Sequence, residues 1–273
     1  MTVMTSRGLS TRAAVRGLGL SRSIEHYTLK QPGKDAGLSG RIQDVSQQFP
    51  RFGYRRVAAW LDVGGKRVWR LWSQMSLALP RRRPRRRRSG NDIRLPNAML
   101  PNTVWSYDFV HDRTANNRAL KLLCVVDEYT RECLAIEVAR SIRGQDVILT
   151  LSRLMRLYGK PSYIRSDNGA EFTARAVMCW LRDKHVGSSF IRPGSPWQNG
   201  IVESFNGKLR DECLNREWFT SVQEARLVIE QWRIFYNHQR PHSSLKYRSP
   251  ATIRQELQLS DNLNTLTTTL ATK

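Results

Sequence analysis

The chain has 273 residues and a formal net charge of +22 at pH 7, from 45 Lys and Arg against 23 Asp and Glu. Its length suggests about two domains and is enough to bury a core, and its charge is typical of proteins that bind nucleic acid. No stretch approaches the roughly 18 apolar residues of a membrane span, and residues 1–30 lack the apolar segment of a secretory signal, so we expect a cytoplasmic protein without a membrane partner.

The positive charge is concentrated in the first part of the chain. Residues 1–100 hold 21 Lys and Arg against 5 Asp and Glu, a surplus of 16 positive charges. The rest of the chain therefore carries a net charge of +6. This asymmetry favours a nucleic-acid-binding half followed by an enzyme half. The four cysteines have no metal-binding spacing and lie in apolar segments, so we interpret them as buried free thiols in a reducing compartment.

Residues 1–79 are expected to be helical and to bind DNA. Residues 11–19 and 23–29 read as two short helices with Ser21 as N-cap of the second, a pattern typical of a helix-turn-helix or of an ordinary helical hairpin. Apolar spacing predicts another helix from Leu38 to Phe49, ended by Pro50, and two more in FGYRRVAAWL and in residues 68–79.

Residues 80–101 form an arginine- and proline-rich linker. The run PRRRPRRRRSG contains no apolar residue and cannot pack into a core. Clustered arginines release counterions from a polyanion whatever its sequence, so we favour contact with the DNA backbone over a merely solvated linker. The candidate DNA-binding residues are Arg81, Arg82, Arg83, Arg85, Arg86, Arg87 and Arg88.

The second half, residues 102–257, is predicted to be an α/β domain. Strands are expected at 104–111, 119–127, 132–139, 161–166 and 190–191, with helices between them at the apolar stripe from Val147 to Leu157 and at 174–184. Three strands followed by alternating helices and strands indicate a mixed sheet flanked by helices. Residues 258–273 are expected to be a disordered tail.

Three carboxylates stand out in this half. Asp108 lies within a strand whose residues alternate apolar and polar, Asp167 follows a short strand at the turn DNG, and Glu203 begins a helix beside its apolar stripe of Val202 and Phe205. Carboxylates that share one pocket repel each other, so they need cations, and hard oxygen ligands suit Mg²⁺ or Mn²⁺. This is a candidate catalytic and metal-binding set for phosphodiester chemistry.

Other charged residues compete for a role. Asp127 follows an apolar strand but lies in a hairpin turn, where capping the turn is the better interpretation, and Asp112 shares a face with Asp108 but is expected at the surface. Arg210, seven positions after Glu203, lies on the same side of its helix. Arg210 and Lys208 are candidate DNA contacts, with surface ion pairs as the alternative.

Several segments together resemble a known family. WSYDFV, VVDEYTRECLAIEV, RSDNGAEF, SPWQNGIVESFNGKLRDECLN and YNHQRPHSSLKYRSP are similar to the catalytic subunit of IS3-family bacterial transposases, which are relatives of retroviral integrases. The resemblance covers about residues 10–255 and includes the 35 residues between Asp167 and Glu203. It implies a ribonuclease H-like mixed sheet, the integrase catalytic core, with a DDE triad at Asp108, Asp167 and Glu203.

The resemblance also implies partners and a reaction. It implies Mg²⁺ or Mn²⁺, two ions, and double-stranded DNA as substrate, namely the terminal inverted repeats of an element and a target. A homo-oligomer on DNA, fusion to the product of an upstream reading frame, and association with the bacterial nucleoid are further expectations. The chain departs from the family where only DVGG, residues 62–65, separates two of the predicted helices, because relatives have a longer link there.

Three alternative functions differ in class. A nuclease with the same triad would stop after hydrolysis, whereas a transposase would go on to join strands. A DNA-binding regulator with an inactive core would not cleave at all. An arginine-rich RNA-binding protein would account for the charge but would leave Asp108, Asp167 and Glu203 without a role.

Overall fold

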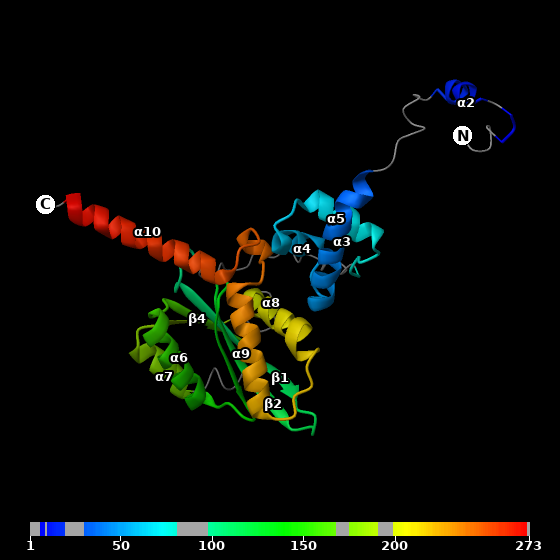
Figure 1. Ribbon diagram of the computed structural model, residues 1–273. Coiled ribbons are helices and arrows are strands. Elements are labelled where there is room, and N and C mark those ends of the chain that lie inside the picture. Colours follow the sequence, from blue (N-terminus) through cyan, green and yellow to red (C-terminus); the bar gives the residue numbers. More distant parts are fainter. Residues whose placement is uncertain are drawn as a thin grey trace, which may run out of the picture. The chain divides into compact units, whose positions relative to one another are not determined.

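The computed structural model describes residues 6–8, 10–19, 30–80, 98–167, 175–190 and 199–271 (Figure 1). The chain divides into two compact units, residues 1–48 and 49–273. Among the helices that the structure describes, none combines the length and the apolar character that crossing a membrane requires. The division falls about thirty residues before the expected domain boundary at residue 79.

The first unit contains two described helices. Helix α2, Thr11–Gly17, begins after Ser10, whose Oγ accepts a hydrogen bond from the N–H of Ala13 at 3.3 Å and so caps the helix. Helix α3, Lys30–Gln48, buries Leu38, Ile42 and Val45 at the predicted spacing. The first helix of the expected helix-turn-helix is therefore confirmed, and the second, residues 23–29, lies outside the described residues.

Helices α4, Tyr54–Leu61, and α5, Gly65–Gln74, open the second unit and pack against each other. The short DVGG link suffices because Asp62 ends α4 in the left-handed conformation, with φ of 51°, which turns the chain within one residue. Val57, Val68 and Trp72 are buried in this hairpin. Helix α4 forms where the apolar pattern predicted it, whereas α5 begins before the expected range of 68–79 and ends at Gln74. Both helices group with the catalytic half of the chain.

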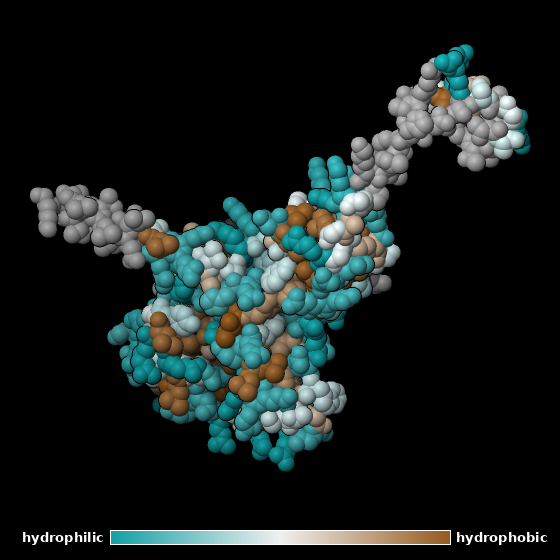
Figure 2. All heavy atoms as spheres, viewed as in Figure 1, coloured by the Kyte–Doolittle hydropathy of each residue, from teal (hydrophilic) through white to brown (hydrophobic). Residues whose placement is uncertain are grey.

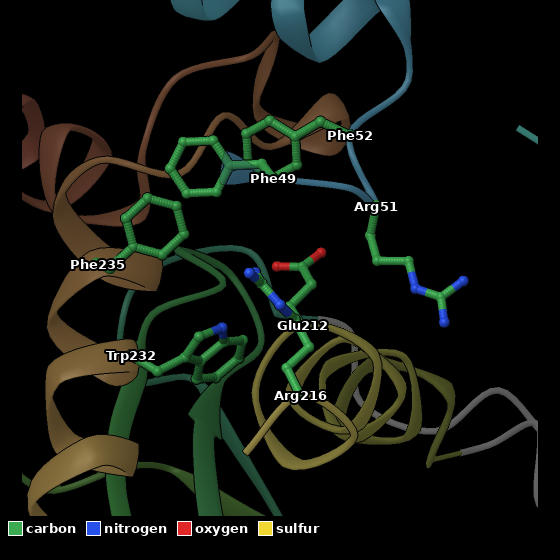
Figure 3. A pocket seen from close by; sticks show the side chains of 7 residues that line it. All are labelled: Phe49, Arg51, Phe52, Glu212, Arg216, Trp232 and Phe235. Atoms are coloured by element: carbon green, nitrogen blue, oxygen red, sulfur yellow. The ribbon is translucent and has the colours of Figure 1, made fainter. Parts of the chain in front are cut away.

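An aromatic cluster explains that grouping. The ring of Phe49 stacks on Phe52 at 4.7 Å and on Phe235 of helix α9 at 5.1 Å, between ring centroids, and Trp60 of α4 lies 6.1 Å from Phe235. Figure 3 shows the three phenylalanine rings side by side above Trp232. Stacked aromatic pairs contribute beyond the area that they bury, so this cluster fixes the α4–α5 hairpin to α9.

The second unit is built on a five-stranded mixed sheet in the order β3-β2-β1-β4-β5. The strands are β1 Val104–Arg113, β2 Ala119–Asp127, β3 Cys133–Ala139, β4 Tyr163–Ser166 and β5 Gly187–Phe190. Strands β1, β2 and β3 pair antiparallel, and β1, β4 and β5 pair parallel. The expected mixed α/β sheet is confirmed, with strand boundaries shifted by at most a few residues.

Helices cover both faces of the sheet (Figure 1). One core lies under α6, Gly144–Tyr158, and α7, Arg175–Asp183, and includes Trp105, Tyr107 and Leu151. The other lies under α8, Gly200–Leu209, and α9, Val222–His238, and includes Val202, Phe205 and Trp232. Alternate residues of β1 therefore face two different cores.

The chain continues differently from the expectation after these helices. Helix α8 runs into a π-helical turn, Arg210–Leu214, and a short 3₁₀ turn, Ser243–Leu245, follows α9. The disordered tail expected from residue 258 is wrong for most of its length, because helix α10 extends over Pro250–Ala271. The start of this helix is fixed to the core, where the Arg254 guanidinium donates to the Glu132 carboxylate.

The visible surface is mainly hydrophilic, with apolar side chains in small separate patches (Figure 2). Trp218 and Leu227 are the most exposed apolar side chains near α9, at 80% and 68%. Scattered apolar residues of this kind are ordinary for a protein surface.

Candidate active site

Asp108 projects from the fifth residue of β1 toward helices α8 and α9. Trp105 and Tyr107 point into the core under α6 and α7, so alternation places Ser106 and Asp108 on the opposite face. There the Asp108 side chain is half-buried. A carboxylate in the middle of a central strand is held on a rigid element, as a catalytic group requires.

Asp167 is aligned with Asp108 by the register of the parallel strands. Ser106 of β1 pairs with Arg165 of β4, the last pair of this ladder, and Asp108 and Asp167 each follow two residues later in their segments. Asp167 thus follows the carboxyl end of β4, as the sequence predicted. The residues directly after it, 168–174, lie outside the described residues.

Glu203 lies in the first turn of α8 and is half-buried, next to the buried Val202 and the exposed Ser204. Val202 and Phe205 pack into the core against the sheet, and Leu209 and Cys213 continue the same stripe. The predicted stripe is confirmed, and it holds Glu203 at the edge of the buried face. Residues 191–198, which lead into the helix, lie outside the described residues.

The pKa of Asp108 depends on the charges of the other two acids. Its pKa is raised to about 6, first by burial and then by the negative charges of Asp167 and Glu203. Hydrogen bonds from the N–H of Phe109 to Oδ1 and from Nδ2 of Asn206 to Oδ2, each 2.8 Å long, act in the opposite direction. The charges of Asp167 and Glu203, which lie on elements far apart in sequence, thus act on the Asp108 carboxylate.

Asn206 is a member of this site that the sequence reasoning missed. It lies one helical turn after Glu203, and this i, i+3 spacing was the available signal. Its Nδ2 donates to Asp108, while its Oδ1 is buried without a hydrogen-bond partner among the described residues. Asn206 therefore fixes the orientation of the Asp108 carboxylate and leaves an acceptor oxygen beside the three acids.

The oxygen donors of this site suit a hard divalent cation, since they comprise three carboxylates and a free amide oxygen. Within the described part of the chain, no three or more His, Cys, Asp or Glu side chains are grouped closely enough to hold a metal ion as they stand.

A buried ion pair adjoins the acids, and the sequence did not reveal it. Nη1 of Arg165 donates to both carboxylate oxygens of Glu128 at 2.8 Å, and the Ser106 hydroxyl donates to the same carboxylate. Arg165 is two residues before Asp167, and Ser106 two before Asp108. This network occupies the sheet face next to the acids and rigidifies the strands that carry them.

The competing acid Asp127 has the structural role that was expected. Its Oδ1 accepts hydrogen bonds from the N–H groups of Tyr129 and Thr130 at 3.0 and 2.8 Å, and its Oδ2 accepts one from the N–H of Asn102 at 2.7 Å. Asp127 is fully buried. The interpretation as a turn cap is confirmed.

The two basic residues of the α8 region have different environments. Lys208 is half-buried, and its Nζ donates to the carbonyl and the hydroxyl of Ser204 at 2.8 and 2.7 Å. Arg210 is exposed and donates to the carbonyl of His111 at 3.1 Å. Its described contacts include no ion pair with Glu203. The DNA-binding role of both residues stays a prediction, and Arg81 to Arg88 lie outside the described residues.

Comparison with known proteins bears on this arrangement. Two family models described as integrase core domain match residues 98–196 and 184–250. A 31.7 kDa protein of insertion element IS407 from Burkholderia multivorans is 44% identical over 250 residues, which cover 89% of this chain and 90% of that protein. This chain belongs to the IS3 family of insertion-sequence transposases.

More distant relatives agree with the assignment of this transposase. A protein of Escherichia coli named as the transposase InsK of insertion sequence IS150 is 27% identical and covers 89% of this chain and 92% of its own. The simian T-cell lymphotropic virus intasome, solved by cryo-electron microscopy, contains a chain that matches with a TM-score of 0.51 at 16% identity, over 72% of this chain and 73% of that one. The expected ribonuclease H-like fold is thereby confirmed for the transposase.

Proposed function

We propose that the transposase cuts DNA at the ends of its element and joins them to a target, with Asp108, Asp167 and Glu203 as the catalytic acids. The observation that carries this proposal is that burial and the charges of Asp167 and Glu203 together raise the pKa of Asp108. Asp108 lies in strand β1, Asp167 directly follows β4, and Glu203 lies in the first turn of α8. A half-buried carboxylate whose pKa is raised by two neighbouring acids supports a functional role.

The three carboxylates would hold Mg²⁺ or Mn²⁺, two ions in the full site. When bound, such ions stabilise the attacking and leaving oxygens of an in-line displacement at phosphorus. The protein's own residues contribute by holding the catalytic acids in position. Asn206 holds the Asp108 carboxylate, and the Glu128 to Arg165 pair holds the strand that precedes Asp167. Lys208 and Arg210 lie further along the helix of Glu203, where cations can hold a phosphate.

The reaction proceeds in two displacements at phosphorus. In the first, water attacks a phosphodiester, a P–O bond forms, the P–O3′ bond breaks, and a free 3′-OH is left at the element's end. In the second, that hydroxyl attacks a phosphodiester of the target, and one P–O bond again replaces another. No external energy source is needed, because each bond that breaks is replaced by an equivalent one.

The substrate is double-stranded DNA that carries the terminal inverted repeats of the element. We propose that the transposase acts on it as a homo-oligomer, since two ends must be joined to one target. Fusion to an upstream-frame product would add further DNA-binding surface. Sequencing the flanks of the gene and measuring the mass of the protein on DNA would test these three points.

Removal of single carboxylates tests the catalytic assignment. Asp108→Asn, Asp167→Asn and Glu203→Gln keep side-chain shape but remove a charged ligand, so each should reduce nicking of a labelled element end and joining of a pre-nicked end to background. Asp112→Asn is the matched control, because it changes an acid on the same strand as Asp108. Normal joining by any of the three variants would remove that residue from the active site.

A measurement without catalysis complements this test. A cation that binds only the folded protein raises its thermal stability, and the effect grows with the cation's concentration. Mg²⁺ or Mn²⁺ should raise the melting temperature of the wild type and of Asp112→Asn, and should not raise that of Asp167→Asn. An equal rise in all three proteins would show that the ions bind elsewhere.

A further inference from the structure

A cleft of about 1160 Å³ opens beside Glu203 and is lined by more cations than carboxylates. Its basic side chains come from four separate places: the α4 region, the turn between β2 and β3, helix α8 and the segment after α9. They are Arg51, Arg56, Arg131, Lys208 and Arg240, against the carboxylates Glu203, Asp211 and Glu212. The cleft thus joins the candidate active site to the α4–α5 hairpin.

One of these carboxylates is already neutralised within the protein. Glu212 accepts hydrogen bonds from Nη2 and Nε of Arg240 at 2.5 and 2.6 Å, and the Arg240 side chain is almost fully buried. The Arg240 guanidinium also lies over the ring of Phe52 at 5.6 Å. Arg240 is therefore a structural cation with its own partner, so the uncompensated charge of the cleft comes from the other basic residues.

The remaining cations act on one another. The pKa of Lys208 is lowered to about 8 by burial and by the charges of Arg240 and Arg56. Burial and Arg240 also lower the pKa of Arg56. Burial is the largest cause of both shifts, and the neighbouring positive charges add to it, while Glu212 acts in the opposite direction.

Arg56 provides a second, independent observation. Its Nε is buried and has no hydrogen-bond partner among the described residues, although a buried N–H of this kind is rarely left unsatisfied. The guanidinium packs over Phe52 at 5.7 Å, which holds it at the cleft wall. A donor kept in place without an acceptor indicates a ligand with acceptor oxygens.

We propose that this cleft binds the phosphodiester backbone of the DNA strand that leads to Glu203, with Arg56 and Arg131 as its phosphate contacts. The proposal rests on the proposed function, which makes DNA the substrate of the adjoining site. A DNA strand supplies acceptor oxygens at regular spacing, and this matches basic residues spread along a cleft better than a single small anion would. Helix α4 then contributes to DNA binding from the catalytic unit itself.

Salt dependence of DNA binding provides the test. The full chain, with Arg56→Gln or Arg131→Asn, is titrated with a short fluorescent duplex between 50 and 200 mM salt. Asn is chosen at 131 because this residue has φ of 63°, which Asn tolerates. In each variant the slope of log affinity against log salt should become less steep by about 0.9. Affinity should therefore fall roughly three- to fourfold less than in the wild type between the two salt concentrations. Arg55→Gln is the matched control, being the exposed neighbour of Arg56 on α4.

A neutral backbone substitution sharpens the test. A methylphosphonate at one position removes the charge of one phosphate, so it should weaken binding of the wild type but have no further effect in the variant that has lost that contact. If no position shows such coupling to Arg56 or Arg131, or if Arg55→Gln lowers the slope equally, the cleft does not bind the backbone. Thermal melting verifies that the variants are folded.

The outcome can be separated from failure of the proposed catalytic function. Glu203→Gln should bind the duplex with nearly the wild-type slope while losing nicking. Arg56→Gln should need a higher DNA concentration than the wild type for half-maximal nicking. Normal slopes in Arg56→Gln and Arg131→Asn, with nicking lost in Glu203→Gln, would overturn the cleft and leave the catalytic proposal intact. Reduced slopes in the arginine variants, with nicking retained by Glu203→Gln, would overturn the catalytic role of Glu203 alone.

Discussion

The two faces of the central sheet are made by alternate residues of the same strands, yet they are stabilised differently. Under α6 and α7, Trp105, Tyr107 and Leu151 form a continuous apolar core. Under α8 and α9, strand β2 keeps a row of apolar residues, but β1 carries Ser106 and Asp108 with a buried ion pair beside them. Both faces depend on filled volume, and the second depends in addition on paired charges, so the two should respond to different kinds of substitution.

Glu128→Gln should have the largest effect on stability. It keeps the shape of the side chain but removes the negative charge that faces Arg165, whose side chain is buried at 8% exposure. Breaking a buried pair on one side costs about 3–5 kcal/mol. Chemical denaturation at neutral pH measures the loss. The double variant Glu128→Leu with Arg165→Met removes both charges and should recover most of it, whereas an additive loss would show that the charges are not coupled.

Leu151→Ala should damage the other face by a comparable or somewhat smaller amount. Leu151 lies on the sheet-facing side of α6 and is fully buried, and removing its side chain leaves a cavity that costs about 2–5 kcal/mol. Leu151→Met, which keeps the volume, should cost about 1.5 kcal/mol or less. The same denaturation measurement applies. Equal losses in the two variants would show that this face does not depend on volume.

The basic cleft predicts a pH effect of intermediate size. The pKa of His242 is lowered to about 3, first by burial and then by Arg240, while Nε2 hydrogen-bonds to the carbonyl of Tyr236 at 3.1 Å. Below the unfolded-state pKa of about 6.5, the unfolded chain binds a proton that the folded chain does not. Stability is therefore lost as the pH falls from about 6.5 toward 3, by about 2 kcal/mol at pH 5.

His242→Gln tests this effect, because Gln can keep the hydrogen bond to Tyr236 but does not titrate. The variant should lose less stability than the wild type between pH 7 and pH 5, by about that 2 kcal/mol. Denaturation curves of both proteins at the two pH values give the difference. Parallel losses in the two proteins would show that His242 is already free to protonate when the protein is folded.

Asn206→Ala should have the smallest effect on stability and a distinct effect on activity. It removes one hydrogen bond in a half-buried position, which should cost about 0.5–1.5 kcal/mol. If Asn206 only orients Asp108, nicking should slow while binding of DNA stays near the wild-type level. Asn206→Gln, which keeps an amide donor, should recover part of the rate; unchanged nicking in Asn206→Ala would exclude this positioning role.

Much of the fold follows from local patterns. The alternation in β1 and the stripe of Val202, Phe205 and Leu209 in α8 predicted elements that the structure confirms, because each pattern records which side of an element is buried. The extension of α10 to residue 271 was missed, since its sequence has few charges and no strong apolar stripe. Local sequence patterns indicate which residues are buried, and the α10 segment shows only a weak pattern of this kind.

The domain boundary shows the same limit. Composition placed it at the arginine run after residue 79, because a charged segment cannot pack. The contacts place α4 and α5 with the catalytic core through Phe49 and Phe235, which are 186 positions apart in the sequence. Stacking between such distant rings leaves no periodic signal in either segment.

The sequence by itself determined the class of fold, the strand and helix order around the acids, and the candidate set of Asp108, Asp167 and Glu203, since turn chemistry and helical spacing are local properties. Only the tertiary structure decided which groups surround them. The bond from Asn206 to Asp108, the pair of Arg165 and Glu128, and the cleft that Arg56 and Arg131 line depend on the packing of separate elements. Contacts of that kind are set by three-dimensional distance, which neighbouring residues in a sequence do not encode.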